Sequence, residues 1–177
     1  IISPEPIQAA GLTASALLAL QHRGQEGAGI ATFYTDDTLI CHKNVGLVND
    51  IFGDFLRHVP STNVAVGHVR YSTTGNNTVE NTQPIETVHS QLTCALAHNG
   101  NITNAAKLRS EMVNQGGKVF HTTNDSEIIN MLLIEQMICC RNIEKAVLNV
   151  MNILEGAFSL VIATPEKLIA ARDKCGF

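Results

Sequence analysis

Four short polar segments contain most of the residues in this 177-residue chain that could carry out chemistry. They span residues 21–26, 68–73, 98–101 and 122–127. Each one lies next to a run of residues with the pattern of a strand or a helix, so each is expected at a junction between a regular element and a loop. Such junctions are where rigid scaffolds hold binding and reactive groups.

Together, these segments describe a binding site for a small zwitterion. Arg70 can hold a carboxylate through two parallel hydrogen bonds, and the carboxylate of Asp125 can bind an ammonium group. The side-chain amide of Asn99 and the backbone N–H of Gly100 can stabilise a developing oxyanion, because glycine lets a substrate approach the backbone closely. The set suits an α-amino acid held for attack at its side-chain carbonyl. Arg23 is a candidate for ordering the pocket loop.

Each of these residues also has a purely structural interpretation. Arg70 could pair with a nearby acid, and an Asn-Gly dipeptide such as residues 99–100 is common in tight turns. Asp125 could complement the dipole at a helix N-terminus. Arg23, followed by a glycine, suits a helix C-terminus. Taken one at a time, none of the segments decides between the two interpretations.

The histidines do not form a metal-binding pattern. His22, His68 and His98 show no ligand spacing such as H-E-x-x-H. The sequence therefore predicts no metal site in this chain, and these side chains are expected to be ordinary hydrogen-bonded histidines.

Composition and charge exclude several classes of function. Hydrophobic residues make up 45% of the chain and charged residues 16%, which suits one globular domain. The net charge is −4, so the chain offers no basic field for nucleic acid. No apolar run is long enough to span a membrane. The chain has an odd number of cysteines, five, and none of them form a C-x-x-C pair. This usage indicates a reducing compartment, so we expect a cytoplasmic protein.

The elements expected to position the polar segments are interspersed helices and strands. Helices are predicted over residues 9–21, 103–113, 124–140 and 142–154, and strands over residues 27–33, 38–43, 64–69, 92–97, 157–163 and 167–172. The first helix is expected to bury one face, formed by Leu12, Ala16, Leu17 and Leu20. Asn124 and Glu127 are expected to form a capping box for the third helix. Because several strands follow one another directly, the sequence favours an α+β fold with antiparallel sheets.

The four segments, in this order and spacing, resemble the glutamine-hydrolysing (class II glutamine amidotransferase) domain of the amidophosphoribosyltransferase family. Residues 20–30 match the most recognisable stretch of that family. Residues 46–48, 67–75, 81–84, 97–101 and 124–127 fit further family segments, as do Arg172, Asp173 and Gly176, so the resemblance covers essentially the whole chain. Related class II enzymes that form hexosamine or asparagine usually differ in the first segment, where His22 and Gln25 favour the purine enzyme.

The resemblance implies a fold and a mechanism. The fold is the N-terminal-nucleophile hydrolase sandwich, in which two antiparallel sheets are stacked between helices in four layers, αββα. In that family the thiolate of an N-terminal cysteine attacks the glutamine side-chain amide, with its own α-amino group as the base. Asn99 and Gly100 would then form the oxyanion hole. Arg70 would hold the glutamine α-carboxylate and Asp125 its α-amino group. The other implied pocket residues are Thr73 and Arg23.

The resemblance also implies a larger parent enzyme. Residues 1–177 would be its glutamine amidotransferase domain, truncated at both ends. The parent uses the ammonia with phosphoribosyl pyrophosphate to make 5-phosphoribosylamine, in the first step of de novo purine synthesis. The expected partners are glutamine, the phosphoribosyltransferase domain of the same polypeptide, and further copies in a dimer or tetramer. No cofactor is expected in this chain. Magnesium and, in some members, an iron–sulfur cluster belong to the rest of the parent.

The chain departs from the family at the nucleophile. The family opens with C-G-x-x-G, which is expected just upstream of Ile1, and none of the five cysteines occupies that position. The chain alone is therefore expected not to hydrolyse glutamine. A second departure, Lys174 in place of the usual proline, concerns only the conformation after Arg172. Two alternatives stay open: a non-catalytic glutamine-binding or regulatory module, and the glutaminase domain of another class II amidotransferase.

Overall fold

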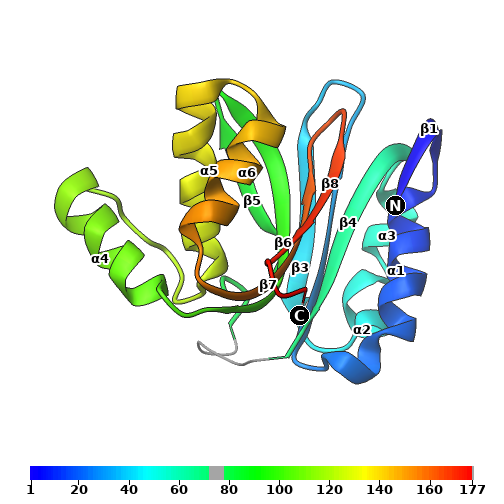
Figure 1. Ribbon diagram of the computed structural model, residues 1–177. Helices are drawn as coiled ribbons and strands as arrows, with labels where there is room; N and C mark the ends of the chain where they lie inside the picture. Colours follow the sequence, from blue (N-terminus) through cyan, green and yellow to red (C-terminus); the bar gives the residue numbers. More distant parts are fainter. Residues whose placement is uncertain (72–77, 177) are drawn as a thin grey trace.

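The computed structural model, which describes residues 1–71 and 78–176, contains two four-stranded antiparallel sheets stacked face to face (Figure 1). The strand order of the first sheet is β1-β4-β2-β3 and that of the second is β5-β6-β7-β8. The strands are β1 (Ile2–Ile7), β2 (Gly27–Phe33), β3 (Leu39–Val45), β4 (Thr62–Arg70), β5 (Ile85–His89), β6 (Leu92–Ile102), β7 (Gly156–Ala163) and β8 (Leu168–Arg172).

Helices cover the outer face of each sheet (Figure 1). The first sheet is covered by α1 (Ala9–Ala19), α2 (Val48–Phe52) and α3 (Phe55–His58), with a short 3-10 helix, η1 (Gln21–Arg23), after α1. The second sheet is covered by α5 (Ser126–Cys140) and α6 (Ile143–Ile153). α4 (Ala105–Gly116) projects away from the sandwich. The predicted four-layer αββα fold is confirmed. None of the helices in the described ranges is both long and apolar enough to cross a membrane.

The interface between the two sheets is built largely from small side chains. Its buried members are Ala31 and Phe33 of β2, Val64 and Val66 of β4, Ala95 and Ala97 of β6, and Ala163 of β7. Larger side chains fill the two outer layers, where the helices pack on the sheets. Side chains alternate between the two faces of a strand. Every second residue after the inward-facing residues of β4 and β6 therefore also points into the space between the sheets.

β6 is longer than predicted. The sequence indicated a strand over residues 92–97, but β6 continues to Ile102 because β7 pairs with it as far as Gly156. Asn99 and Gly100 therefore lie inside a strand, opposite Ser159 and Phe158. This pairing removes the interpretation of the Asn-Gly dipeptide as a tight turn.

The buried face of α1 differs from the prediction. Leu17 is buried as expected, but Leu12, Ala16 and Leu20 are exposed. The helix buries Ala9, Ala10, Thr13, Ala14 and Leu17 instead. Residues 9–20 contain no charged side chain, so the sequence carries no polar face that would fix the orientation of the helix. Gly67 of β4 fixes it in the structure: a Cβ atom there would lie 2.7 Å from Thr13 and 2.8 Å from Leu17.

Two strands have only a weak sequence signal. For β1, only Ile1 and Ile2 indicated a strand. It carries Pro4 and Pro6 and lies at the edge of its sheet, where a missing backbone donor is tolerated. β5, a short strand of five residues, was not predicted. It pairs in register with β6, from Ile85 opposite Leu96 to His89 opposite Leu92. Both strands depend on their partners more than on their own composition.

The cysteines differ widely in their surroundings. Cys94 is buried in the core between α5 and the second sheet, and burial raises the pKa of its thiol to about 11. Burial, with the nearby Glu86 carboxylate, raises the pKa of Cys41 to about 12. Cys139 and Cys175 are exposed. Since the thiolate is the reactive form, Cys41 and Cys94 are held in an unreactive state.

This difference predicts the order of alkylation. At pH 8 we expect iodoacetamide to modify Cys139 and Cys175 in the folded protein, and to modify Cys41 and Cys94 only after denaturation. Peptide mass mapping of native and urea-denatured samples would measure the order. Native alkylation of Cys94 as fast as that of Cys175 would contradict the described core.

Candidate functional site

A cavity of about 640 Å³ opens where β4 and β6 carry their polar residues past the hydrophobic interface. Five of the predicted site residues line it, namely Arg23, Arg70, Asn99, Gly100 and Asp125. The sixth, Thr73, lies outside the described residues. The structure therefore brings together groups that are up to about a hundred positions apart in the sequence.

Strand alternation directs Arg70 into the space between the sheets. Val64 and Val66 face the inter-sheet core, so His68 and Arg70, at the same spacing of two along β4, lie on the same face. Arg70 is only 4% exposed. Its Nη1 donates a hydrogen bond to the Thr78 carbonyl oxygen over 3.3 Å. Burial lowers the pKa of the guanidinium and the nearby Glu26 charge opposes this shift, but an arginine of this kind stays charged in proteins.

The segment after α1 packs directly on the backbone of Arg70. A Cβ atom at Gly24 would lie 2.7 Å from the Arg70 carbonyl carbon, so only glycine allows this approach. The Glu26 N–H donates to the Arg70 carbonyl oxygen over 3.2 Å. The Gln21 side chain secures the same segment, because it donates to the Gly24 carbonyl and accepts from the Val48 N–H over 2.7 Å. Arg23 is thereby placed at the cavity wall.

Asn99 and Gly100 lie side by side on β6 at the cavity. Asn99 is at the spacing of two from Ala95 and Ala97, so its side chain lies on the inter-sheet face, where the hydrophobic core has ended. It is exposed. Gly100 has φ = 151°, and a Cβ atom there would lie 2.1 Å from the Ala157 carbonyl oxygen. No other residue fits this position, because only glycine allows this close approach to β7. Gly100 is also exposed and lines the cavity.

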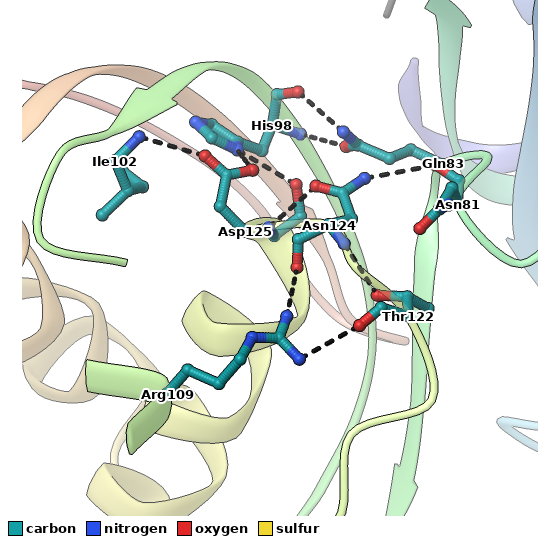
Figure 2. Close-up of polar contacts among 9 residues, drawn as sticks. Asn81, Gln83, His98, Ile102, Arg109, Thr122, Asn124 and Asp125 are labelled. Carbon is teal, nitrogen blue, oxygen red and sulfur yellow. Dashed lines mark hydrogen bonds and ion pairs between the residues drawn. The ribbon is translucent and has the colours of Figure 1, made fainter. Parts of the chain in front are cut away.

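Asp125 is held as a carboxylate at the start of α5 (Figure 2). Its Oδ2 accepts a hydrogen bond from the Ile102 N–H over 3.0 Å, and its Oδ1 lies 3.5 Å from His98 Nδ1. Burial raises the pKa of this carboxyl group, but the hydrogen bond and charge of His98, with the N–H groups of Ile102 and Ser126, lower it further. The net shift is downward, so Asp125 is ionised at neutral pH.

The predicted capping box is wrong. Glu127 does not reach back to the Asn124 N–H; its carboxylate accepts hydrogen bonds from the backbone N–H groups of His121 and Thr122 over 2.9 and 2.8 Å. The Asn124 side chain accepts from the Ser126 N–H over 3.0 Å instead. The loop before α5 folds back toward the helix, so the carboxylate meets this loop rather than the residue three positions before it.

Sequence reasoning missed the histidines that support the site. His98 is 3% exposed, and its Nδ1 lies 3.0 Å from the Ser126 hydroxyl as well as close to Asp125. Burial, together with the charges of His98 and Arg70, lowers the pKa of His68 to about 4, so this ring is neutral at physiological pH. The His98 Nε2 and His68 Nδ1 atoms are buried without a hydrogen-bond partner within the described part of the chain. The sequence predicted ordinary hydrogen-bonded histidines at both positions and gave neither a role at the site.

Gln83 joins the two sheets at the cavity (Figure 2). Its side chain donates to the His98 carbonyl over 3.0 Å and accepts from the His98 N–H over 2.6 Å, so it binds the outer edge of β6 like a strand residue. On the other side, a Cβ atom at Gly29 of β2 would lie 2.3 Å from the Gln83 carbonyl oxygen. Residues 81–84 were noted in the sequence as one of the family segments, and the structure shows what Gln83 does.

The arrangement suits recognition of a small molecule that carries one positive and one negative charge. A buried guanidinium and an ionised carboxylate line one cavity, and an amide side chain with an open glycine backbone lies between the elements that carry them. Such a site can bind an α-amino acid by its two charged groups and leave its side chain at Asn99 and Gly100.

Comparison with known proteins agrees with this geometry. Residues 68–177 match the family of glutamine amidotransferase domains. The chain is 43% identical over 161 residues to an amidophosphoribosyltransferase of Methanocaldococcus jannaschii, covering 91% of this chain and 34% of that protein. It is 42% identical over 176 residues to the amidophosphoribosyltransferase of Synechocystis sp., covering 99% of this chain and 35% of that protein.

A solved structure has the same fold. The glutamine phosphoribosylpyrophosphate amidotransferase from B. subtilis, complexed with ADP and GMP, superposes with a TM-score of 0.84 and 34% sequence identity, over 97% of this chain and 36% of that one. The chain thus spans about a third of the length of the relatives it matches. Because the family match covers more than half of its residues, the chain belongs to the glutamine amidotransferase domain family.

Proposed function

We propose that this chain binds glutamine and serves as the glutaminase domain of an amidophosphoribosyltransferase. The observation that carries the proposal is the placement of Arg70 and Asp125 on one cavity with Asn99 and Gly100. Arg70 binds the α-carboxylate of glutamine and Asp125 binds its α-ammonium. The side-chain amide then lies at Asn99 and Gly100, with Arg23 at the wall and Thr73 contributing nearby.

The proposed reaction needs a cysteine thiolate. The sulfur attacks the amide carbon, and the oxyanion of the tetrahedral intermediate accepts hydrogen bonds from the Asn99 side chain and the Gly100 backbone. The α-amino group of the same cysteine takes the thiol proton as the sulfur attacks. The C–N bond then breaks, this α-amino group gives the proton to the leaving nitrogen, ammonia departs, and a thioester remains. Water then cleaves the thioester to give glutamate and the free thiol.

The register of β1 supports a nucleophile just upstream of Ile1. Ile1 and Ala65 exchange two backbone hydrogen bonds of 2.9 and 3.0 Å, and Ile2 lies opposite Val64. In an antiparallel pair, each residue upstream of Ile1 would lie opposite the next residue of β4. The fifth would lie opposite Arg70, at the cavity. If the C-G-x-x-G pattern of the family directly precedes Ile1, its cysteine is this fifth residue.

One observation favours a second candidate, a module that binds glutamine without hydrolysing it. None of the five cysteines lines the cavity formed by the described residues. Labelling the complete natural polypeptide with a diazo-ketone analogue of glutamine, followed by peptide mapping, separates the two. Label on a cysteine preceding Ile1 supports the hydrolase, and no label despite glutamine binding supports the binding module.

The acceptor of the ammonia belongs to this proposal too. The named relatives support a phosphoribosyltransferase domain on the same polypeptide and synthesis of 5-phosphoribosylamine from phosphoribosyl pyrophosphate. Homo-oligomer formation, magnesium or an iron–sulfur cluster in the rest of the parent, and a cytoplasmic location stay predictions from the sequence.

The charge assignments predict how glutamine affinity responds to substitution. Arg70→Lys loses the two-pronged contact, and Asp125→Asn loses the charge that pairs with the ammonium. Each should weaken glutamine binding by about tenfold or more, the equivalent of one charged hydrogen bond. Isothermal titration calorimetry measures this, with Arg57→Lys on α3 as a matched surface control and thermal unfolding as the folding control. Wild-type affinity in both variants would show that Arg70 and Asp125 do not bind the charged groups of glutamine.

The oxyanion assignment predicts an effect on turnover. In the complete polypeptide, Asn99→Ala should lower kcat for glutamine hydrolysis by about a hundredfold or more, with a much smaller change in KM, because the donor acts on the transition state. Ammonia release measures both constants. A near-normal kcat would show that Asn99 has only a structural role in β6.

The lowered pKa of Asp125 predicts the pH range of binding. The ammonium needs the carboxylate, so affinity should stay constant as the pH falls from 7 to 5 and be lost as the pH falls through the pKa of Asp125, below the usual value of 3.8. Calorimetry at pH 7, 6 and 5 measures the range of constant affinity, and further titrations below pH 4 measure the loss. A large loss near pH 6 would instead indicate that protonation of a histidine controls binding.

A further inference from the structure

Arg109 connects the projecting helix α4 to the loop that carries Asp125. From the middle of α4, its Nη1 donates to the Thr122 carbonyl oxygen over 3.0 Å and its Nη2 donates to the Asn124 carbonyl oxygen over 3.2 Å (Figure 2). The guanidinium carbon also lies 4.1 Å from the centre of the Phe120 ring, in a cation–π contact. One side chain thus binds three positions of the segment that leads into α5.

These contacts reach the backbone next to the ammonium-binding carboxylate. The Asn124 carbonyl belongs to the peptide bond that joins Asn124 to Asp125. Arg109 therefore restrains the plane of that peptide, on which the direction of the Asp125 side chain depends. Among the described residues the guanidinium makes no ion pair with a carboxylate, and both of its hydrogen bonds are to the loop backbone.

Other side chains restrain the same loop from different elements. Asn81 accepts from the Thr123 N–H over 3.2 Å, and its carbonyl accepts from the Asn124 side chain over 3.2 Å. Glu127 binds the loop from α5, as described above. Arg109 differs from both in its origin, because α4 lies outside the sandwich (Figure 1). Arg109 and Asn81 contact the loop from different sides, so both restrain its backbone (Figure 2).

α4 itself is fixed at the end nearest the cavity. Asn104, just before its first turn, donates to the Ile153 carbonyl over 3.0 Å and accepts from the Glu155 N–H over 3.1 Å. The strand before it ends at Ile102, whose N–H donates to Asp125. The start of α4 is thus tied to the end of α6, and Arg109 extends this rigid support to the loop.

We infer that Arg109 is a positioning residue for recognition of the substrate ammonium: it holds the backbone of residues 122–124 so that Asp125 faces the cavity. The inference rests on the proposed function, since it assumes that Asp125 binds the α-ammonium of glutamine. Lysine cannot replace it fully, because its single ammonium cannot span two carbonyl groups with the fixed geometry of a guanidinium.

The test uses two ligands and a double-mutant cycle. Arg109→Gln should weaken glutamine binding by about fivefold to tenfold, the equivalent of roughly one hydrogen bond, and Arg109→Lys should fall between it and the wild type. Binding of 4-carbamoylbutanoate, which is glutamine without its α-amino group, should change by less than about twofold. In an Asp125→Asn background, Arg109→Gln should add little further loss, because coupled residues are not additive.

Calorimetry on the wild type, on Arg109→Gln, Arg109→Lys, Asp125→Asn and the Arg109→Gln/Asp125→Asn double variant, and on the surface control Arg57→Gln gives all the constants. An Arg109→Gln variant that binds glutamine as the wild type does overturns the inference. So does an equal loss for both ligands, or a full additional loss in the Asp125→Asn background. If Arg109→Gln unfolds, Phe120→Leu takes its place with the same expected selectivity for glutamine, because it removes the ring that stacks on Arg109 and keeps an apolar side chain against the core. A wild-type protein that binds neither ligand would contradict the proposed function itself.

Discussion

The antiparallel pairing of β6 with β7 as far as Ile102 and Gly156 is the constraint on which the cavity depends. It keeps the backbone straight past the last hydrophobic residue of the inter-sheet core and carries Asn99 and Gly100 into a polar space. The close approach of the Ala157 carbonyl leaves room for glycine alone at position 100. A tight turn at this dipeptide would reverse the chain before Ile102 and remove the N–H that binds Asp125.

The two charges of the site are held by different kinds of contact. Arg70 is placed by a strand whose inward face is set by Val64 and Val66, and by the glycine that lets the segment after α1 pack on its backbone. Asp125 is placed by a loop and a helix start, where hydrogen bonds rather than strand alternation fix the geometry. The cation is therefore part of a stiff sheet, whereas the anion depends on the network that includes His98, Asn81 and Arg109.

This division bears on how such a site could vary among related proteins. A change in the sheets would disturb Arg70, Asn99 and Gly100 together, since β4 and β6 pack through the same core of small residues. A change in α4 or in the loop before α5 would act mainly on the position of Asp125. Local differences in stability of this kind are common where a scaffold carries a binding loop.

The sequence by itself determined most of the fold and the identity of the charged groups. Strand alternation and turn residues were sufficient for β2 and for the hairpin of β7 and β8, because hairpins depend on neighbours in the chain. The types and order of the polar segments were sufficient to identify five residues that line the cavity, because charged and amide groups at the ends of predicted elements are typical of a binding site. The tertiary structure decided what depends on distant partners. It set the buried face of an uncharged α1 through Gly67, extended β6 through β7, and turned the Glu127 side chain toward residues 121–122. It also brought Gln83 to His98 and Arg109 to Asn124, contacts that no local pattern encodes because each partner is satisfied only after the chain has folded.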